Sequence, residues 1–248
     1  MTCLLPPIAL IALCLAAVTA QFPTWPTAKG NKRADSTISV TGTLDGKFVR
    51  YTAGSALGDG GQKEGQKPIF ELKAGASLKN VIIGAPAADG IHCLGSCYLE
   101  NVWWEDVGED AASFLGSGNN NYTVNTGGAR KAHDKVFQHN GGGTVYIKNF
   151  QVENFTKFYQ ACGTCPAMTR KVVMDAIRAK GPGLALVGVM TKNGDTATLT
   201  NIQVDSKVTY ICQRYNDGAG IGKAGQYTAK QNGDGKQCKY STGNIKMI

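Results

Sequence analysis

Acidic side chains are sparse in this chain, and several of them gather in one segment. Asp89 is followed by Glu105 and Asp106, and then by Glu109 and Asp110. Carboxylates that share one face repel one another unless a cation lies between them. Hard oxygen ligands of this kind are the ones that Ca²⁺ prefers. The segment therefore predicts a calcium site, with solvated carboxylates on separate loops as the alternative.

Basic side chains follow the acidic segment. Lys131 and Lys135 lie in the stretch after Asn125, and Lys157 lies in the stretch after Asn149. Surface lysines are common, so each of them alone is most simply a solvated side chain. Together with the preceding carboxylates they form an acidic block followed by a basic block. The two blocks together are more informative than any single lysine.

These residues follow short β-branched segments that recur along the chain. Each segment has an apolar residue, one spacer, Asn or Asp, and then alternating apolar positions. The clear copies contain Asn80, Asn101, Asn149 and Asn201, and the weaker copies contain Asn125 and Asp175. A period of 21 to 26 residues built from short strands indicates a solenoid whose stacked coils share one core. An asparagine at the same turn of every coil would hydrogen-bond along the stack.

An all-β, single-stranded parallel β-helix fits this period best. A leucine-rich repeat requires a leucine scaffold that is missing, and a β-sandwich with coincidental spacing is the competing interpretation. In a β-helix, equivalent positions on adjacent coils lie about 4.8 Å apart. Asp89 lies nine residues after Asn80, and Glu109 and Asp110 lie eight and nine residues after Asn101. Stacking would therefore bring the three carboxylates together.

The first twenty residues have the pattern of a cleaved leader. Residues 4–20 carry no charge and end in the small-residue sequence Val-Thr-Ala, which is typical of a secretory signal peptide. Two early prolines and the lack of a flanking basic cluster argue against a transmembrane helix. We expect residues 1–20 to be removed, leaving one secreted, extracellular domain at residues 21–248.

Six cysteines remain once the leader is removed, and an even count in an exported chain indicates disulfides. They are Cys93, Cys97, Cys162, Cys165, Cys212 and Cys238. The sequence leaves their pairing open. The spacing within the first two close pairs would also suit zinc, which secretion disfavours. Sequons that begin at Asn121 and Asn154 are candidate glycan sites.

The formal net charge is +8, and the leader contributes none of it. In a secreted protein this surplus favours an acidic polysaccharide over nucleic acid, although a solvated basic surface is the simpler alternative. We expect a monomer with no nucleic-acid and no membrane partner.

Three longer segments resemble the family 3 pectate lyases. They are VIIGAPAADGIHC at 81–93, ENVWWEDVGEDA at 100–111 and HDKVFQHNG at 133–141, and the resemblance extends from about residue 38 to residue 248. It implies a right-handed parallel β-helix, Ca²⁺ as the cofactor, and eliminative cleavage of polygalacturonate, the pectate of the plant cell wall.

The resemblance also implies roles for individual residues. It implies Asp89, Glu109 and Asp110 as calcium ligands, Lys135 as the base, Lys157 as the lysine that grips the substrate, and Glu64 as a glutamate at the cleft that is sometimes considered an acid. Lys131 is a further candidate for substrate binding. A lysine acts as a base only when it is deprotonated. We expect a bound cation and Lys157 to lower the pKa of Lys135, because nearby positive charge disfavours its protonated form.

The chain departs from the family at one position. The family pattern is Lys-x-x-Arg, but here Lys157 is followed three residues later by Gln160. Gln160 can contact a substrate but cannot supply a positive charge to its carboxylate. Arg170, or else Arg130, is a candidate to take the place of the missing arginine.

We expect a secreted pectate lyase that cleaves (1→4)-α-D-galacturonan into 4,5-unsaturated oligogalacturonides. The alternative, suggested by Gln160, is a catalytically weakened relative that binds pectin as a lectin-like or host-sensed factor. A hydrolytic polygalacturonase on the same fold is disfavoured, because the sequence has no Asp-Asp pair to activate water and no Gly-His-Gly element.

Overall fold

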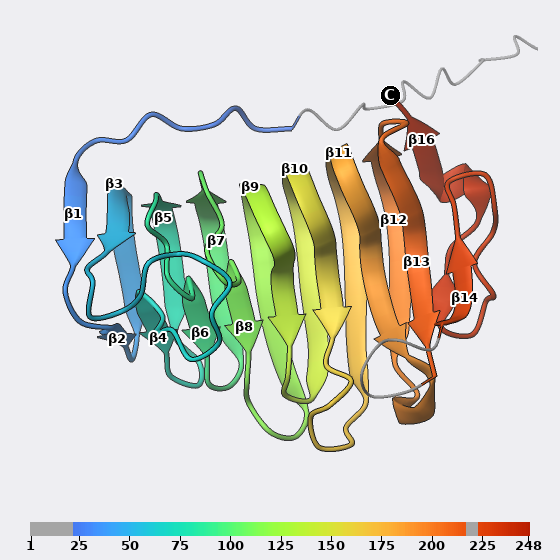
Figure 1. Ribbon diagram of the computed structural model, residues 1–248, viewed down its shortest axis with the longest axis horizontal. Coiled ribbons are helices and arrows are strands. Elements are labelled where there is room, and N and C mark those ends of the chain that lie inside the picture. The colour runs from blue at the N-terminus through green and yellow to red at the C-terminus, as the bar shows by residue number, and fades with distance from the viewer. Residues whose placement is uncertain (1–21, 217–222) are drawn as a thin grey trace, which may run out of the picture.

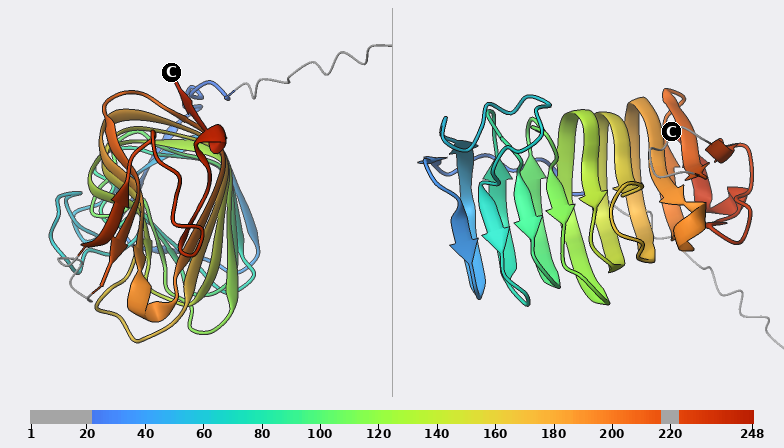
Figure 2. Two further views of the ribbon diagram at one scale, coloured as in Figure 1. Left: turned by 90° about the vertical axis from the view of Figure 1, so that its right-hand side faces the viewer. Right: turned by 60° about the horizontal axis from the view of Figure 1, so that its bottom comes forward.

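The computed structural model describes residues 22–216 and 223–248, so the leader predicted at residues 1–20 lies outside them. The described chain is an elongated stack of coils that runs from β1 to β16 (Figure 1). Viewed along the stack, the coils overlie one another around a shared core (Figure 2). No helix within these residues is long and apolar enough to cross a membrane. The predicted all-β parallel β-helix is confirmed.

Strands of successive coils pair in two parallel rows. The first row contains β1 (Asn31–Ala34), β3 (Thr43–Ala53), β5 (Ser77–Ile83), β7 (Cys97–Trp104) and β12 (Thr196–Val204), followed by β15 (Cys238–Lys239) and β16 (Ile245–Met247). The second row contains β2 (Ile38–Val40), β4 (Phe70–Leu72), β6 (Ile91–Cys93), β8 (Ala112–Phe114) and β13 (Val208–Tyr215).

Three long strands belong to both rows because each bends partway along its length. They are β9 (Asn120–His139), β10 (Gly143–Ala161) and β11 (Arg170–Met190). One strand, β14 (Lys223–Tyr227), belongs to neither row and pairs with β13 in the antiparallel direction. Two short 3₁₀ helices, η1 (Thr191–Asn193) and η2 (Thr242–Asn244), interrupt the C-terminal coils.

In each of six coils, a residue with left-handed backbone bends the part of the strand that belongs to the first row. These residues have φ between 52° and 61°, and they are Asn80, Asn101, Thr126, Asn149, Ala176 and Asn201. Asparagine tolerates this conformation better than most residues with a side chain, which explains its recurrence. The positions predicted at Asn125 and Asp175 were wrong by one residue. Strand register aligns both of them with the residue before the bend on neighbouring coils.

The predicted ladder of amide side chains therefore forms only in part. The side-chain amide of Asn101 donates to Asn80 Oδ1 at 2.8 Å, and the side-chain amide of Asn80 donates to Asp45 Oδ1 at 3.0 Å. Asn125 instead donates to the hydroxyl of Tyr98 at 3.2 Å. Thr126 and Ala176 carry no side-chain amide, so the ladder cannot continue through their coils.

Aliphatic side chains stacked in register fill the core beneath the first row. One column consists of Leu78, Leu99, Val124, Ile147, Met174 and Leu199, each at most 1% exposed. Burial of one such side chain stabilises the fold by about 1.5–3 kcal/mol. Beneath the second row, aromatic rings pack instead, with Phe137 at 5.9 Å from Phe114 and at 5.5 Å from Phe158.

The segment before β1 lies across several coils and runs along the top of Figure 1. The Gln151 amide donates to the Pro23 carbonyl at 2.6 Å. The Trp25 ring packs edge-on against Trp103 at 4.9 Å, and the Arg130 guanidinium lies 3.7 Å from it. The N-terminal segment thus ties β7, β9 and β10 together and occupies Arg130.

Three disulfides account for the six cysteines outside the leader. They join Cys93 to Cys97, Cys162 to Cys165, and Cys212 to Cys238. The predicted disulfides are confirmed, and the pairing leaves no thiolate for zinc at either of the two close pairs.

We predict that Asn101→Ala lowers the free energy of unfolding by about 2–4 kcal/mol. The change removes the hydrogen bond to Asn80 and the one that the Trp103 indole donates to Asn101 at 2.8 Å. It also places an alanine where φ is 59°. Asn101→Gly loses the same bonds without the steric cost, so it should be about 1 kcal/mol less destabilising. Chemical denaturation followed by circular dichroism measures both. A glycine variant less stable than the alanine variant would contradict this account of the bend.

Candidate functional site

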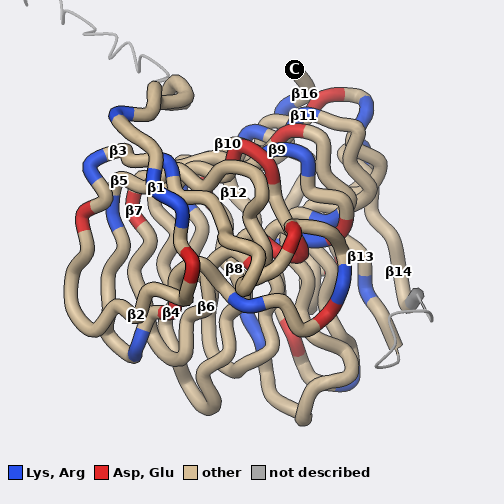
Figure 3. The backbone as a smooth tube through the Cα atoms, turned by 60° about the vertical axis from the view of Figure 1, so that its left-hand side comes forward, with Lys and Arg blue, Asp and Glu red and all other residues tan. Residues whose placement is uncertain are grey.

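Three carboxylates meet on the outer surface of the second row. Asp89 lies just before β6, whereas Glu109 and Asp110 lie just before β8, and their oxygens approach within 4.8 Å of one another. Coil stacking produces this arrangement, since the Glu109 amide donates to the Ala88 carbonyl at 2.8 Å. In Figure 3, acidic and basic segments come together on the coils beside β8.

Burial makes this cluster electrostatically costly. Asp89, Glu109 and Asp110 are 9%, 6% and 2% exposed. Burial, together with the Asp89 carboxylate, raises the pKa of Glu109 to about 7. Burial also raises the pKa of Asp110 well above its usual value, although the nearby Lys135 ammonium opposes the shift. The protein groups alone thus leave these carboxylates poorly compensated.

The remaining contacts of the cluster suit a cation with oxygen ligands. His92 Nε2 lies 2.7 Å from Asp89 Oδ2, and the Ser113 hydroxyl donates to Asp110 Oδ2 at 3.2 Å. Each of these contacts orients one carboxylate oxygen. The other oxygen, Oδ1, is buried without a hydrogen-bond partner among the described residues in both aspartates. Orphaned carboxylate oxygens in a cluster of three acidic groups fit Ca²⁺.

Lys135 lies on the next coil against these carboxylates. Its Nζ is 2.8 Å from Asp134 Oδ2, 3.4 Å from Glu109 Oε1 and 3.6 Å from Asp110 Oδ1, and its side chain is 12% exposed. Burial lowers the pKa of Lys135, but the carboxylates of Asp110, Asp134 and Glu109 more than offset it and hold the pKa above its usual value. The protein groups around Lys135 therefore do not supply the lowered pKa that we expected from the sequence.

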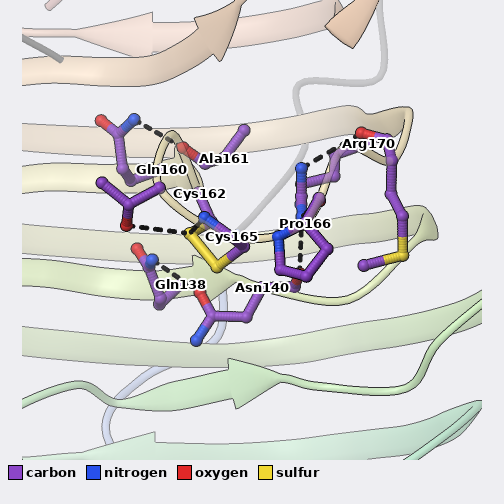
Figure 4. The surroundings of a disulfide bond; sticks show 10 residues. Gln138, Asn140, Gln160, Ala161, Cys162, Cys165, Pro166 and Arg170 are labelled. Carbon is purple, nitrogen blue, oxygen red and sulfur yellow. Dashed lines mark hydrogen bonds between the residues drawn. A yellow bond between two sulfur atoms is a disulfide. The ribbon is translucent and has the colours of Figure 1, made fainter. Parts of the chain in front are cut away.

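Lys157 continues the row by one further coil, in register with Lys135. Gln160 pairs in the same way with Gln138 and is 7% exposed. Its amide donates to the Ala161 carbonyl at 2.8 Å (Figure 4). Because a carbonyl only accepts, this bond fixes the amide orientation and turns Oε1 away. Oε1 has no hydrogen-bond partner among the described residues, so Gln160 offers an acceptor rather than a positive charge.

Glu64 reaches the same site from a loop of an earlier coil. It lines a pocket of about 120 Å³ together with the three carboxylates and Lys135. The Gln62 amide donates to the Gly108 carbonyl at 2.7 Å and holds this loop beside the cluster. Lys131 does not line the pocket. It is exposed and forms an ion pair with Asp106 at 3.4 Å.

Arg170 and Arg130, the two candidates to replace the missing arginine, both contact other parts of the protein. Arg170 is completely buried, and its guanidinium donates to the carbonyls of Asn140 at 2.7 Å, Pro166 at 3.1 Å and Met168 at 3.1 Å (Figure 4). It holds the loop between β10 and β11, so its assignment to substrate binding was wrong. Arg130 is occupied by Trp25.

Several residues of the pocket were missed from the sequence, namely His92, Ser113, Gln138 and Asn140. The first three form one row with Gln160, in register across four coils. His92, Ser113 and Gln138 lie three residues after Asp89, Asp110 and Lys135, respectively. Gln160 follows Lys157 at this same spacing, so the spacing is the sequence signal that identifies His92, Ser113 and Gln138.

The fold is a parallel β-helix that carries a row of acidic and then basic residues, and comparison with known proteins gives the family. The pectate lyase family model matches residues 22–220. The chain is 42% identical to pectate lyase E of Emericella nidulans, over 90% of this chain and 85% of that protein. The chain therefore belongs to the pectate lyase family, which confirms the predicted family and enzyme class.

Solved structures agree. The catalytic domain of pectate lyase PelI from Erwinia chrysanthemi superposes with a TM-score of 0.72 at 28% identity, covering 88% of this chain and all of that domain. PelI in complex with tetragalacturonic acid superposes with a TM-score of 0.71 at 28% identity, covering 87% of this chain and 70% of that one.

We predict that Asp110→Asn weakens calcium binding at least tenfold, because it removes one charge from the carboxylate cluster. Asp106→Asn is the matched control, since Asp106 pairs with Lys131 outside the cluster, and it should change the dissociation constant less than twofold. Isothermal titration of each protein with CaCl₂ measures both. Equal losses in the two variants would contradict the assignment of the cluster.

Proposed function

We propose that this chain is a secreted lyase that cleaves polygalacturonate by calcium-assisted β-elimination. One observation carries the proposal. The carboxylates of Asp89, Glu109 and Asp110 lie directly beside Lys135, which lies in register with Lys157. If the carboxylates hold a cation, Lys135 is the base and the Lys157 ammonium binds a substrate carboxylate, these three groups lie on consecutive coils, as an anionic sugar polymer would require. The relative crystallised with tetragalacturonic acid supports the choice of substrate.

The difficulty of the reaction lies in the C5 proton of the uronate. Its removal places negative charge next to the carboxylate, so that carboxylate must first be neutralised. A calcium ion held by Asp89, Glu109 and Asp110 would supply much of this neutralisation. Lys157 would contribute the rest by pairing its ammonium with the same carboxylate.

Lys135 is the candidate base. In its neutral form, which alkaline pH favours, it would take the C5 proton. The electron pair of the C5–H bond becomes the C4–C5 double bond, and the bond between C4 and the glycosidic oxygen breaks. The departing oxygen needs a proton, and Glu64 at the edge of the pocket is the candidate donor. The products are a shortened chain and a 4,5-unsaturated oligogalacturonide.

The disulfides and exposed sequons support secretion. Disulfides persist in oxidising, extracellular compartments, and three are formed here. Asn121 and Asn154 are both exposed, so a glycan at either would not disturb the core. Cleavage of residues 1–20, glycan attachment and a monomeric state stay predictions.

We predict that Lys135→Ala lowers kcat by about 10²–10⁴ while changing the affinity for polygalacturonate less than twofold, because a base acts in the transition state. Lys157→Ala should lower kcat and also weaken binding, because its ammonium holds the substrate carboxylate in both states. Lys171→Ala is the control, since Lys171 is an exposed lysine on β11. Initial rates come from the absorbance of the unsaturated product, and affinities from titration calorimetry. A Lys135→Ala variant that turns over normally would remove Lys135 from the mechanism.

We predict that Gln160→Arg raises kcat about tenfold, which corresponds to about 1.4 kcal/mol of transition-state stabilisation. The change restores a positive charge three residues after Lys157, where neither Arg170 nor Arg130 can serve. Gln160→Leu is the control, because it removes the unpaired carbonyl oxygen without adding charge. Lower activity in Gln160→Arg would mean that the native site already neutralises its substrate. If the native protein binds polygalacturonate but forms no unsaturated product, it is the pectin-binding relative instead.

A further inference from the structure

Besides the pocket that contains the carboxylates and Lys135, the surface has a second hollow, which lies beside Lys157. It has a volume of about 380 Å³, within the range of about 300–1,000 Å³ typical of ligand pockets. The residues Lys157, Ala185 and Tyr210 are in register on three coils and are called the cleft row below. The hollow is lined by the residues that immediately precede them. Thr156 precedes Lys157 on β10, Leu184 precedes Ala185 on β11, and Thr209 precedes Tyr210 on β13. The hollow therefore begins next to Lys157 and extends toward the C-terminal coils.

On the coil next to Lys157, the cleft row itself offers no open surface, and Tyr210 on the coil beyond is only half-buried. Ala185 is the register partner of Lys157, and it is completely buried. In the row of Gln160, the next residues are the buried Gly188 and the fully buried Gln213. Beside them, in contrast, Leu184 is 39% exposed. A polymer that passes over Lys157 toward β13 therefore finds accessible surface in the hollow on the first coil that it reaches.

The floor and walls of the hollow have the chemistry of a sugar site. The Phe155 ring lies directly over Gly183, where any β-carbon would collide with it. Leu184 and the exposed Pro182 provide apolar surface for the C–H face of a sugar ring. Thr156 and Thr209 add hydroxyl groups; the Thr156 hydroxyl donates to the His133 carbonyl at 2.7 Å and keeps its acceptor capacity.

The charge of the hollow selects an anion. Its lining includes the exposed side chains of Lys207 and His133 and no carboxylate. Lys207 has no ion-pair partner within residues 22–216 and 223–248. The nearby Asp205 carboxylate accepts from the backbone amides of Gly181 and Lys207, both at 3.0 Å. An uncommitted ammonium at the edge of an apolar and hydroxyl-lined hollow complements the carboxylate of an acidic sugar.

We propose that this hollow binds a galacturonate unit of the same polymer, away from the bond that is cleaved, with Lys207 paired to its carboxylate. The inference rests on the proposed function, because it takes its ligand from the substrate assigned there. Lys207 directly precedes the β13 coil, which lies two coils beyond Lys157, or about 10 Å at the usual spacing of parallel strands. Only a substrate longer than a few sugar units can occupy the carboxylate cluster and Lys207 together.

Chain-length dependence tests the assignment. Lys207→Ala should raise KM for hexagalacturonate and for polygalacturonate about fivefold, as expected for loss of one partly exposed ion pair. It should change kcat/KM for trigalacturonate less than twofold, and Lys207→Arg should retain the native values. Lys148→Ala, an exposed lysine on β10 outside the hollow, is the control. The protein should come from a host that does not N-glycosylate, because Asn154 lines the hollow.

Equilibrium binding separates this proposal from the proposed function. Hexagalacturonate is titrated into the Lys135→Ala protein with and without Lys207→Ala, and the second change should weaken binding about fivefold. If Lys207→Ala weakens binding but the native protein makes no unsaturated product, the assignment of the hollow is supported and the lyase mechanism is overturned. Normal turnover with no effect of Lys207→Ala on hexagalacturonate, or an equal effect on the trimer and the hexamer, would overturn the hollow alone.

Discussion

In-register stacking of parallel coils is the constraint on which the site depends. Strand pairing fixes each residue beside its counterpart on the next coil, so a side chain at a given offset acquires neighbours from about twenty-five residues away. Lys135 and Lys157 are brought side by side in this way, and so are Gln138 and Gln160. The core column from Leu78 to Leu199 and the left-handed bends keep this register. A one-residue slip of any coil would turn its cleft residues toward another face.

The same stacking brings like charges together, and their electrostatic repulsion and burial destabilise the fold. Three carboxylates with little exposure lie within 4.8 Å of one another. Lys135 compensates part of this charge, and its own pKa is raised as a result. A divalent cation would compete with Lys135 for the same oxygens. Cation binding at these carboxylates would therefore be coupled to the state of the candidate base through shared oxygens.

The features that could be predicted from the sequence are those that follow from a local pattern repeated at a fixed period. The strand repeat identified the solenoid, and the offsets of Asp89 and Asp110 from their asparagines placed both in one cluster. The bends at Thr126 and Ala176 were missed, because the flanking Asn125 and Asp175 match the pattern better than the residues that turn. Arg170 was misplaced for a different reason. Arg170 begins an apolar strand, and its sequence neighbours give no sign of a partner for its guanidinium. The carbonyls that accept from it come from two separate loops. Those loops are visible only in three dimensions.

The central claim is that the carboxylate cluster and the two lysines act together on an anionic sugar polymer. The most direct measurement is the formation of unsaturated uronate by the purified protein on de-esterified polygalacturonate at alkaline pH, before and after removal of divalent cations with a chelator. This account predicts product that accumulates with calcium, stops with chelator and returns when calcium is restored. Product that forms at the same rate after chelation, or hydrolysis to saturated oligogalacturonides, would contradict it.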